Sequence, residues 1–218
     1  MIKQKIFNIF KRLDLDNPLE FVRKILAPLC KEKLEEHIIA CEDCKTCRNC
    51  NKKLPMGNPD ANILIINDNA TDNEEVNDYT MNILETAGLD LKDVYMINSV
   101  SCILKREFNN ESIIRLPNRQ ELKNCKYFVD YAIDFVKPRV IILMGATSLS
   151  MYRNDLTLEE IKGQYIEVNG VKAIVTHSAK DLFSMLEYYS EDEVYSIAEK
   201  VAEDVANAKA YLNNLERR

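Results

Sequence analysis

The chain has 218 residues, of which 46% are hydrophobic and 29% charged, and its formal net charge is −6. This length suffices for one α/β domain with a sizeable core and a short extension. The negative charge argues against a broad nucleic-acid coat but leaves room for a local basic groove. No run approaches 18 apolar residues and the N-terminus lacks the features of a signal peptide, so we expect a cytoplasmic protein with no membrane span.

The first forty residues carry apolar side chains at helical spacing, with a break near Pro18, a residue that suits the first turn of a helix. We therefore expect an N-terminal helical extension over residues 1–40 and one larger domain over residues 41–218. The extension is expected either to pack on the domain as a lid or to act as an arm that docks a partner protein.

Cysteines are unusually dense in the region after this extension. Six of the seven are Cys41, Cys44, Cys47, Cys50, Cys102 and Cys125. An intracellular chain does not normally use so many thiols for disulfides, so an iron–sulfur cluster or a zinc ion is the expected occupant. The first four do not follow the bacterial-ferredoxin run, whose last spacing is longer and ends in proline. They also lack the long separation between two Cys pairs that is typical of a zinc ribbon.

Short apolar runs alternate with helical patterns over the rest of the chain. The predicted strands are 63–66, 94–97 and 140–145, followed by a hairpin over 166–175 with an Asn-Gly turn. The predicted helices are 76–87, 117–135, one beginning at 146, and 191–215. A loop containing residues 109–110 is expected before the second of these helices. The alternation predicts an α/β fold of three layers, α/β/α, with helices on both faces of a mostly parallel sheet.

Polar residues follow the predicted strands, at the edge where ligands bind to a parallel sheet. Asp68 follows the first strand, Asn98 the second, and His177 the hairpin. Each residue alone is common as a cap, a turn residue or a surface residue, but together they are expected to converge on one crevice. An acid, an amide and an imidazole suit the hydrolysis of a bond beside a polar base or sugar.

Several motifs together resemble those of the family 4 uracil-DNA glycosylases, which carry a [4Fe–4S] cluster. They are Cys41-x2-Cys44 and the segments 57–61, 93–102, 115–125, 138–148, 161–163 and 176–182. They occur in the family's order and with compatible spacing over about residues 41–212. The resemblance implies the fold of the uracil-DNA glycosylase superfamily.

The resemblance also implies a ligand set for the cofactor. The four implied ligands of a [4Fe–4S] cluster are Cys41, Cys44, Cys102 and Cys125. Cys47 and Cys50 fall outside this set. A zinc ion, a cluster that uses Cys47 or Cys50, and the absence of a metal are the alternatives.

The activity that the resemblance implies is base excision repair of DNA: a deoxyuridine is flipped out of the stack and its N-glycosidic bond is hydrolysed. Asp68 would orient or activate the attacking water. Asn98 would read the uracil edge, and His177 would donate a hydrogen bond to a uracil oxygen as negative charge develops there. The further expected substrate contacts are Asn67, Tyr79 as a stacking ring, and Ser178.

The chain departs from the family pattern after the first strand. The family has Gly-Glu-Ala-Pro-Gly there, whereas residues 67–71 read Asn-Asp-Asn-Ala-Thr and lack the glycines that permit close approach of a phosphate. The family's aromatic stacking segment is shortened, the proline after His177 is missing, and about seven extra residues lie near 105–114. These departures favour an alternative function, a catalytically degenerate subunit that binds DNA or assists replication.

The expected partners are uracil-containing or single-stranded DNA and, through the N-terminal helices, a replication or repair protein.

Overall fold

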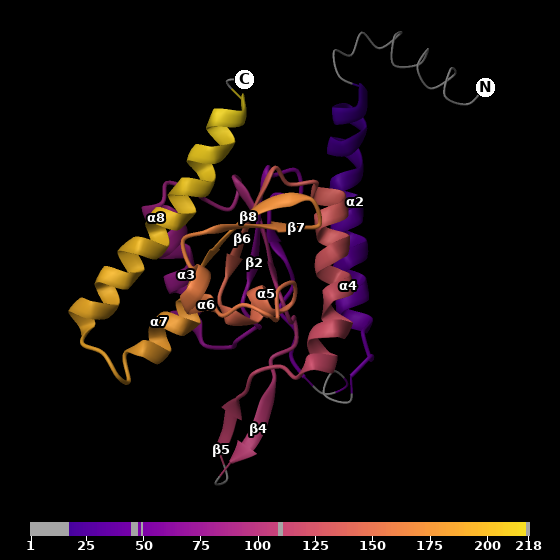
Figure 1. Ribbon diagram of the computed structural model, residues 1–218. Helices are drawn as coiled ribbons and strands as arrows, with labels where there is room; N and C mark the ends of the chain where they lie inside the picture. The colour runs from indigo at the N-terminus through magenta and orange to yellow at the C-terminus, as the bar shows by residue number, and fades with distance from the viewer. Residues whose placement is uncertain (1–17, 45–47, 49, 109–110, 217–218) are drawn as a thin grey trace.

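A central sheet of six strands lies between two layers of helices in the computed structural model, which describes residues 18–44, 48, 50–108 and 111–216 (Figure 1). The strands are β1 (Met56–Gly57), β2 (Ile63–Asn67), β3 (Val94–Asn98), β6 (Val140–Met144), β7 (Tyr165–Val168) and β8 (Val171–Thr176). Their order is β1-β3-β2-β6-β8-β7, and the two edge strands are antiparallel to their neighbours while the central pairs are parallel. The predicted α/β fold with a mostly parallel sheet is confirmed.

The central strands are buried on both faces, which explains their continuous apolar runs. All five residues of β6 are buried, as are the first four of β2 and of β3. β2 is in register with both neighbours, since Ile63 pairs with Val94 on one side and with Val140 on the other. The three strands therefore end at one edge of the sheet.

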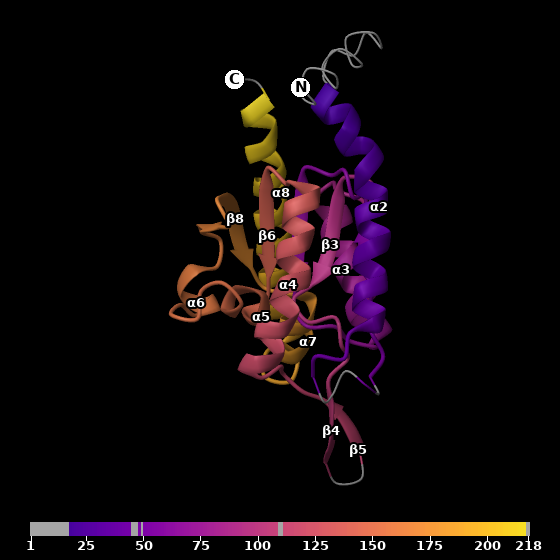
Figure 2. The same cartoon turned by 90° about the vertical axis from the view of Figure 1, so that its right-hand side faces the viewer.

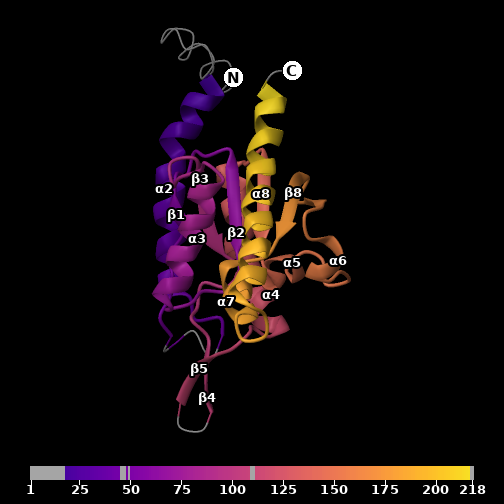
Figure 3. The ribbon, with the colours of Figure 1, turned by 90° about the vertical axis from the view of Figure 1, so that its left-hand side faces the viewer.

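Helices cover each face of this sheet. On one face lie α2 (Pro18–Ala40) and α4 (Arg119–Val136), which stand in front of the sheet in Figure 2. On the other lie α3 (Glu74–Thr86), α7 (Ala179–Met185) and α8 (Glu191–Glu216), seen in front in Figure 3. Two short helices, α5 (Ala146–Ser150) and α6 (Leu158–Ile161), lie between β6 and β7 in the chain. Among the described residues, no helix is both long and apolar enough to cross a membrane.

The described part of the N-terminal extension packs on the domain. Ala27, Leu34 and Ile38 of α2 are buried, and the latter two belong to the same apolar cluster as residues of α4 and the sheet. Residues 1–17, which carry the first predicted helical run, lie outside the described residues. The division into an extension and a domain stays a prediction.

The connection from β3 to α4 differs from the expected loop. It contains a second, two-stranded sheet in which β4 (Lys105–Phe108) pairs antiparallel with β5 (Glu111–Ile114). This hairpin stands away from the body of the molecule in Figures 1, 2 and 3. The charged sequence Lys-Arg-Glu-Phe of β4 is exposed at every position, so it lacks the alternation of apolar and polar residues by which a half-buried strand is recognised.

A glycine allows β1 to approach β3 closely at the antiparallel edge of the sheet. Gly57 has φ +91°, and a Cβ there would lie 2.3 Å from the carbonyl oxygen of Val94. Gly170, in the β7–β8 turn, has a similar φ of +80°, but a Cβ at that position would meet no atom within 4 Å. Alanine substitutions at the two glycines therefore distinguish the cost of backbone strain alone, at Gly170, from the cost of strain with steric overlap, at Gly57.

We expect Gly170→Ala to lower the free energy of unfolding by roughly 1–2 kcal/mol, the cost of a left-handed conformation for a residue with a Cβ. Gly57→Ala should cost more, because it adds an overlap with the β3 backbone. Urea unfolding of the two variants measures the difference. Equal losses would show that β1 can move away from β3 without cost.

Candidate active site and cysteine cluster

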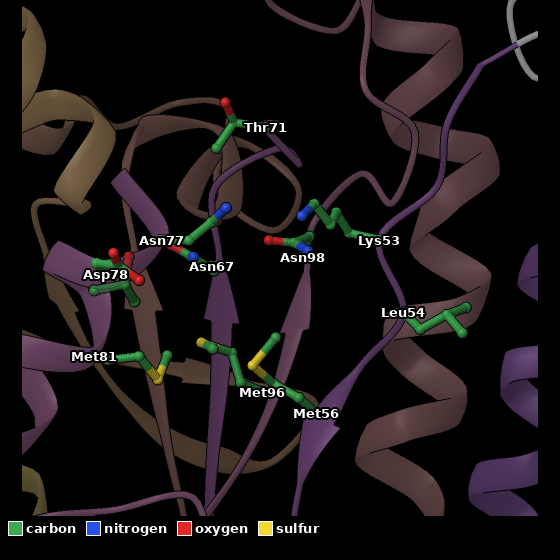
Figure 4. A pocket seen from close by; sticks show the side chains of 11 residues that line it. Lys53, Leu54, Met56, Asn67, Thr71, Asn77, Asp78, Met81, Met96 and Asn98 are labelled. Carbon is green, nitrogen blue, oxygen red and sulfur yellow. The ribbon is translucent and has the colours of Figure 1, made fainter. Parts of the chain in front are cut away.

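Two amide side chains meet at the ends of neighbouring parallel strands. Asn67 ends β2, Asn98 ends β3, and the two residues are paired in register. Both line a cavity of about 170 Å³. In Figure 4 the side chain of Asn98 lies between those of Asn67 and Lys53. The cavity thus presents amide groups, the cation Lys53 and the carboxylate Asp78 at the carboxyl end of the sheet.

Apolar side chains form the rest of this cavity. Met56, Met81 and Met96 line it together with the polar residues Thr71 and Asn77. A cavity of about 150 Å³ is large enough to hold benzene, so this one has room for a six-membered ring. Apolar walls with a few convergent polar groups are typical of a small-ligand site.

Asp68 is not among the residues that line this cavity. It lies in a bend directly after Asn67, the last residue of β2. Its carboxylate is 4% exposed, accepts a hydrogen bond from the backbone N–H of Asn69 at 2.8 Å, and lies 3.5 Å from Oγ of Ser178. Burial raises the pKa of Asp68, and a hydrogen bond with Thr147 opposes that increase.

A glycine allows this placement of Asp68. Gly145 follows β6 with φ +92°, and a Cβ there would lie 2.8 Å from Oδ2 of Asp68 and 3.0 Å from Cβ of Ser178. The family's glycines after the first strand are absent from this chain, but a glycine across the sheet provides the close approach to the acid.

His177 is buried in the short turn between β8 and α7, directly before Ser178. Its Nε2 lies 3.4 Å from Oε1 of Glu159, and its Nδ1 lies 3.9 Å from Oδ2 of Asp181. Neither ring nitrogen has a hydrogen bond to any described residue. His177 lines a second cavity of about 400 Å³ together with Thr176 and Asp204. Asn98 thus lines the first of these two cavities and His177 the second, and Asp68 is in the lining of neither. The single crevice expected from the sequence stays a prediction.

Carboxylates surround His177 on several sides. Burial favours a higher pKa for Asp181, but the His177 imidazole and hydrogen bonds from Ser178 lower its pKa overall. Burial raises the pKa of Asp204, whose Oδ2 accepts a hydrogen bond from the Thr176 hydroxyl at 2.7 Å. An imidazolium at position 177 would therefore have acidic neighbours.

The two remaining expected substrate contacts have structural partners. The Ser178 hydroxyl caps α7 by accepting a hydrogen bond from the N–H of Asp181, whose carboxylate accepts one from the N–H of Ser178. The ring of Tyr79 packs edge-on against Phe183, with centroids 5.6 Å apart, and Tyr79 is not among the residues that line the cavity of Asn67 and Asn98. Their roles with a substrate stay predictions.

The four expected cluster ligands come together. Cys102 and Cys125 are buried in one apolar cluster with Val100 and Leu104. The partly buried residues packed against it are Cys41, Cys44, Cys50 and Leu122. Cysteines from the α2–β1 connection, the β3–β4 connection and α4 thus meet at one place.

Backbone pairing explains why Cys50 joins this group. Lys52 forms an isolated antiparallel bridge with Cys102, and the N–H of Ile103 donates to the carbonyl of Asn51 at 2.9 Å. This pairing places Cys50 close to Cys102, because diagonal neighbours on paired strands are about 7–8 Å apart. The resemblance to the family left Cys50 outside the ligand set, and Cys47 lies outside the described residues.

Polar contacts hold the cysteine-bearing segments. The side-chain amide of Asn124 donates to Sγ of Cys44 at 3.3 Å and to the carbonyl of Asp43 at 3.0 Å. The amine of Lys52 donates to the carbonyl of Cys41 at 2.7 Å. Among the described residues, no three His, Cys, Asp or Glu side chains form a group that could hold a single metal ion.

Sequence reasoning missed several cavity residues. Lys53, Thr71 and Asn77 line the cavity, but nothing in their local sequence marks them, since they lie in connections and on a helix surface. Only the packing of these segments in the folded chain places them beside the ends of β2 and β3.

Comparisons with known proteins identify the family of this chain. The model of the uracil DNA glycosylase superfamily matches residues 54–195, and the chain belongs to this superfamily. The matched range contains both amides, Asp68, His177, Cys102 and Cys125, and it begins after the first cysteines.

Curated relatives include three type-4 uracil-DNA glycosylases. That of Sulfurisphaera tokodaii is 27% identical over 149 residues, which is 61% of this chain and 64% of the relative. That of Thermotoga maritima is 28% identical over 133 residues, 60% of this chain and 62% of the relative. That of Saccharolobus solfataricus is 26% identical over 160 residues, 65% of this chain and 71% of the relative. The match spans less than two thirds of the first two relatives, and it confirms the resemblance drawn from the motifs.

The raised pKa of Asp68 leads to a test of stability. A carboxyl group with a raised pKa in the fold binds its proton more tightly there than in the unfolded chain, so stability falls as pH rises from about 4 through the raised pKa. Asp68→Asn removes this penalty and keeps an oxygen that can accept from Asn69. We expect its melting temperature at pH 7 to exceed that of the wild type, and the difference to shrink as pH falls.

Glu199→Gln, which changes an exposed carboxylate in α8, serves as the control and should leave the melting temperature unchanged. A lower melting temperature for Asp68→Asn at pH 7 would mean that the hydrogen bonds of Asp68 outweigh its burial.

Proposed function

We propose that this protein is a uracil-DNA glycosylase that hydrolyses the N-glycosidic bond of deoxyuridine in DNA. The observation that carries the proposal is the pair of amides, Asn67 and Asn98, at the in-register ends of β2 and β3. They line a cavity with room for a pyrimidine ring, in a chain that belongs to the uracil-DNA glycosylase superfamily. The curated relatives named type-4 uracil-DNA glycosylase support the same activity.

The two amides have different parts in this proposal. The side-chain oxygen of Asn67 already accepts the N–H of Asp68 at 2.9 Å, so Asn67 orients the loop and has its NH₂ group left for a ligand. Asn98 reads the uracil edge, since its oxygen can accept from N3–H while its NH₂ donates to O4. The lining residue Lys53 places a positive charge near the phosphate backbone or the departing base.

Asp68 is the proposed activator of the attacking water. Its raised pKa makes it a stronger base than an exposed carboxylate, which favours proton abstraction near neutral pH. Its Oδ2 faces Gly145 and Ser178 in this structure, so catalysis requires the loop of residues 67–71 to admit a water molecule when DNA binds.

His177 is the proposed stabiliser of negative charge on the departing uracil. The ring is buried, with Nε2 3.4 Å from Glu159 and Nδ1 3.9 Å from Asp181. These carboxylates limit its orientation, and a fixed orientation supports the role.

We expect Asn98→Ala and Asp68→Asn each to lower the rate of uracil release by a factor of about ten to a thousand, the range for one oriented polar group at a transition state. DNA affinity should hardly change, because phosphate contacts supply most of it. Single-turnover assays on an oligonucleotide with one uracil measure both quantities.

Asn82→Ala removes an exposed amide on α3 and should retain full activity. Release that survives both site substitutions would place the chemistry elsewhere, and no release by the wild type in excess over substrate would refute the proposal.

We also propose a [4Fe–4S] cluster held by Cys41, Cys44, Cys102 and Cys125. The buried, sulfur-rich cluster and the hydrogen bond from Asn124 to Cys44 fit such a group, since donors to ligand sulfurs are typical of iron–sulfur sites. The cluster would link three chain segments. The free energy of binding it would therefore contribute to the free energy of folding.

Anaerobically purified protein should be brown and contain about four irons per chain. Cys102→Ala and Cys125→Ala should lose both iron and solubility, whereas Cys30→Ala, in α2, should lose neither. Cys50→Ala decides between ligand sets, because retention of iron supports the four proposed ligands and loss of iron adds Cys50. Stoichiometric zinc without iron, measured by elemental analysis, would refute the cluster. A replication or repair partner for the N-terminal helices stays a prediction.

A further inference from the structure

The β4–β5 hairpin projects from the same end of the sheet as the candidate active site. It follows the carboxyl end of β3 after residues 99–104 and is itself followed by α4. Figures 1 and 2 show it extending beyond the end of the sheet where α5 begins. The described extra residues, 105–108 and 111–114, therefore form a paired element at the end of the sheet that carries the site.

The base of the hairpin is fastened to the loop that carries Asp68. The amine of Lys105 lies 2.5 Å from Oδ2 of Asp72, and this hydrogen bond lowers the pKa of Asp72. The N–H of Ala70 donates to the carbonyl of Val100 at 2.8 Å, which joins the same two segments. The direction of the hairpin is thus set relative to the active-site loop.

One face of the hairpin combines a cation with an exposed aromatic ring. Arg106 and Phe108 share a face because residues alternate along a strand, and the guanidinium carbon lies 5.9 Å from the ring centroid. Phe108 is 57% exposed. Glu107 points to the opposite face, whereas the strand register places Glu111 directly opposite Phe108, on the face of Arg106.

We propose that this face of the hairpin binds the DNA strand beside the flipped nucleotide, with Phe108 stacked on a base and Arg106 directed at a phosphate. This inference rests on the proposed function. Bases stack on aromatic side chains irrespective of sequence, and an arginine beside the ring adds attraction to the backbone.

Charge distinguishes the hairpin from the exposed tyrosines between α7 and α8. Tyr188 and Tyr189 are exposed there, but the acidic residues Glu187, Glu191 and Asp192 surround them in the sequence. Phosphates would be repelled there. The hairpin face carries the cation Arg106 with a single acidic residue, Glu111, among its described residues, so it has no excess of negative charge against DNA.

The chain contains no tryptophan, so Phe108→Trp places a single fluorescent probe on the hairpin. Tyr127→Trp, at a residue of α4 that is 61% exposed, is the matched control. Both full-length variants are titrated with the same oligonucleotide, once with and once without a uracil. We expect DNA to quench the tryptophan at 108 strongly and the one at 127 little, because stacking on a base brings the indole into contact with it.

Affinity supplies the second measurement. Phe108→Ala should bind uracil-free DNA about tenfold more weakly, in line with the loss of one stacked base, and Tyr127→Ala should bind normally. Arg106→Ala should reduce the slope of log affinity against log salt by about one, as expected for one phosphate contact. Circular dichroism establishes that each variant is folded.

The outcomes separate this inference from the proposed function. Equal quenching at 108 and 127, or unchanged affinity of Phe108→Ala, overturns the hairpin contact even if uracil is released. DNA binding through Phe108 without any uracil release supports the hairpin contact and refutes the glycosylase. A wild-type protein that does not bind DNA overturns both.

Discussion

The in-register pairing of β2 with β3 and with β6 is the constraint on which the rest of the structure depends. Because the three strands are parallel and aligned, their carboxyl ends fall at one edge of the sheet. The backbone hydrogen bonds of these strands, rather than contacts among the polar side chains, bring Asn67 beside Asn98 and Gly145 beside Asp68. A one-residue shift of register between β2 and β3 would separate the side chains of Asn67 and Asn98, because it turns the residues of one strand to the opposite face.

The close approach of Gly145 to Asp68 shows a local conflict between stability and chemistry. Desolvation disfavours the charged form of this acid, and its hydrogen bonds only partly offset that effect. Such strained groups persist where the surrounding structure holds them, and they are frequent at functional sites. Here the surrounding sheet core is fully buried, so one unfavourable carboxyl group is tolerated.

The β3–α4 connection contains both a buried cysteine of the sulfur-rich cluster and an exposed hairpin. At its start lies Cys102 in the sulfur-rich cluster, at its middle the exposed hairpin, and just beyond its end Cys125. A bidentate ion pair between Arg115 and Glu121 closes the connection onto the first turn of α4. A long connection can project from the body when both of its ends are fixed in this way, and this geometry makes the hairpin a defined element.

The sequence by itself determined much of this protein. Continuous apolar runs predicted the buried strands β2, β3 and β6, and the Asn-Gly turn predicted the β7–β8 hairpin, because these signals are local. The polar residues Asn67 and Asn98 were placed at strand ends for the same reason. The motifs located the cysteines that the structure brings together and identified the family that the comparisons confirm.

Tertiary structure alone decided which of the candidate site residues line the same cavity or cluster. The bend after β2 places Asp68 beside Gly145 and Ser178, and packing of α3 against α7 places Tyr79 against Phe183. Cys50 joins the sulfur cluster through the pairing of its segment with a distant one, at the bridge between Lys52 and Cys102, and the charged β4 strand forms without an apolar signal. Local sequence fixes the period of an element, whereas register, facing and long-range pairing depend on contacts between distant segments, and these contacts determine the geometry of the site.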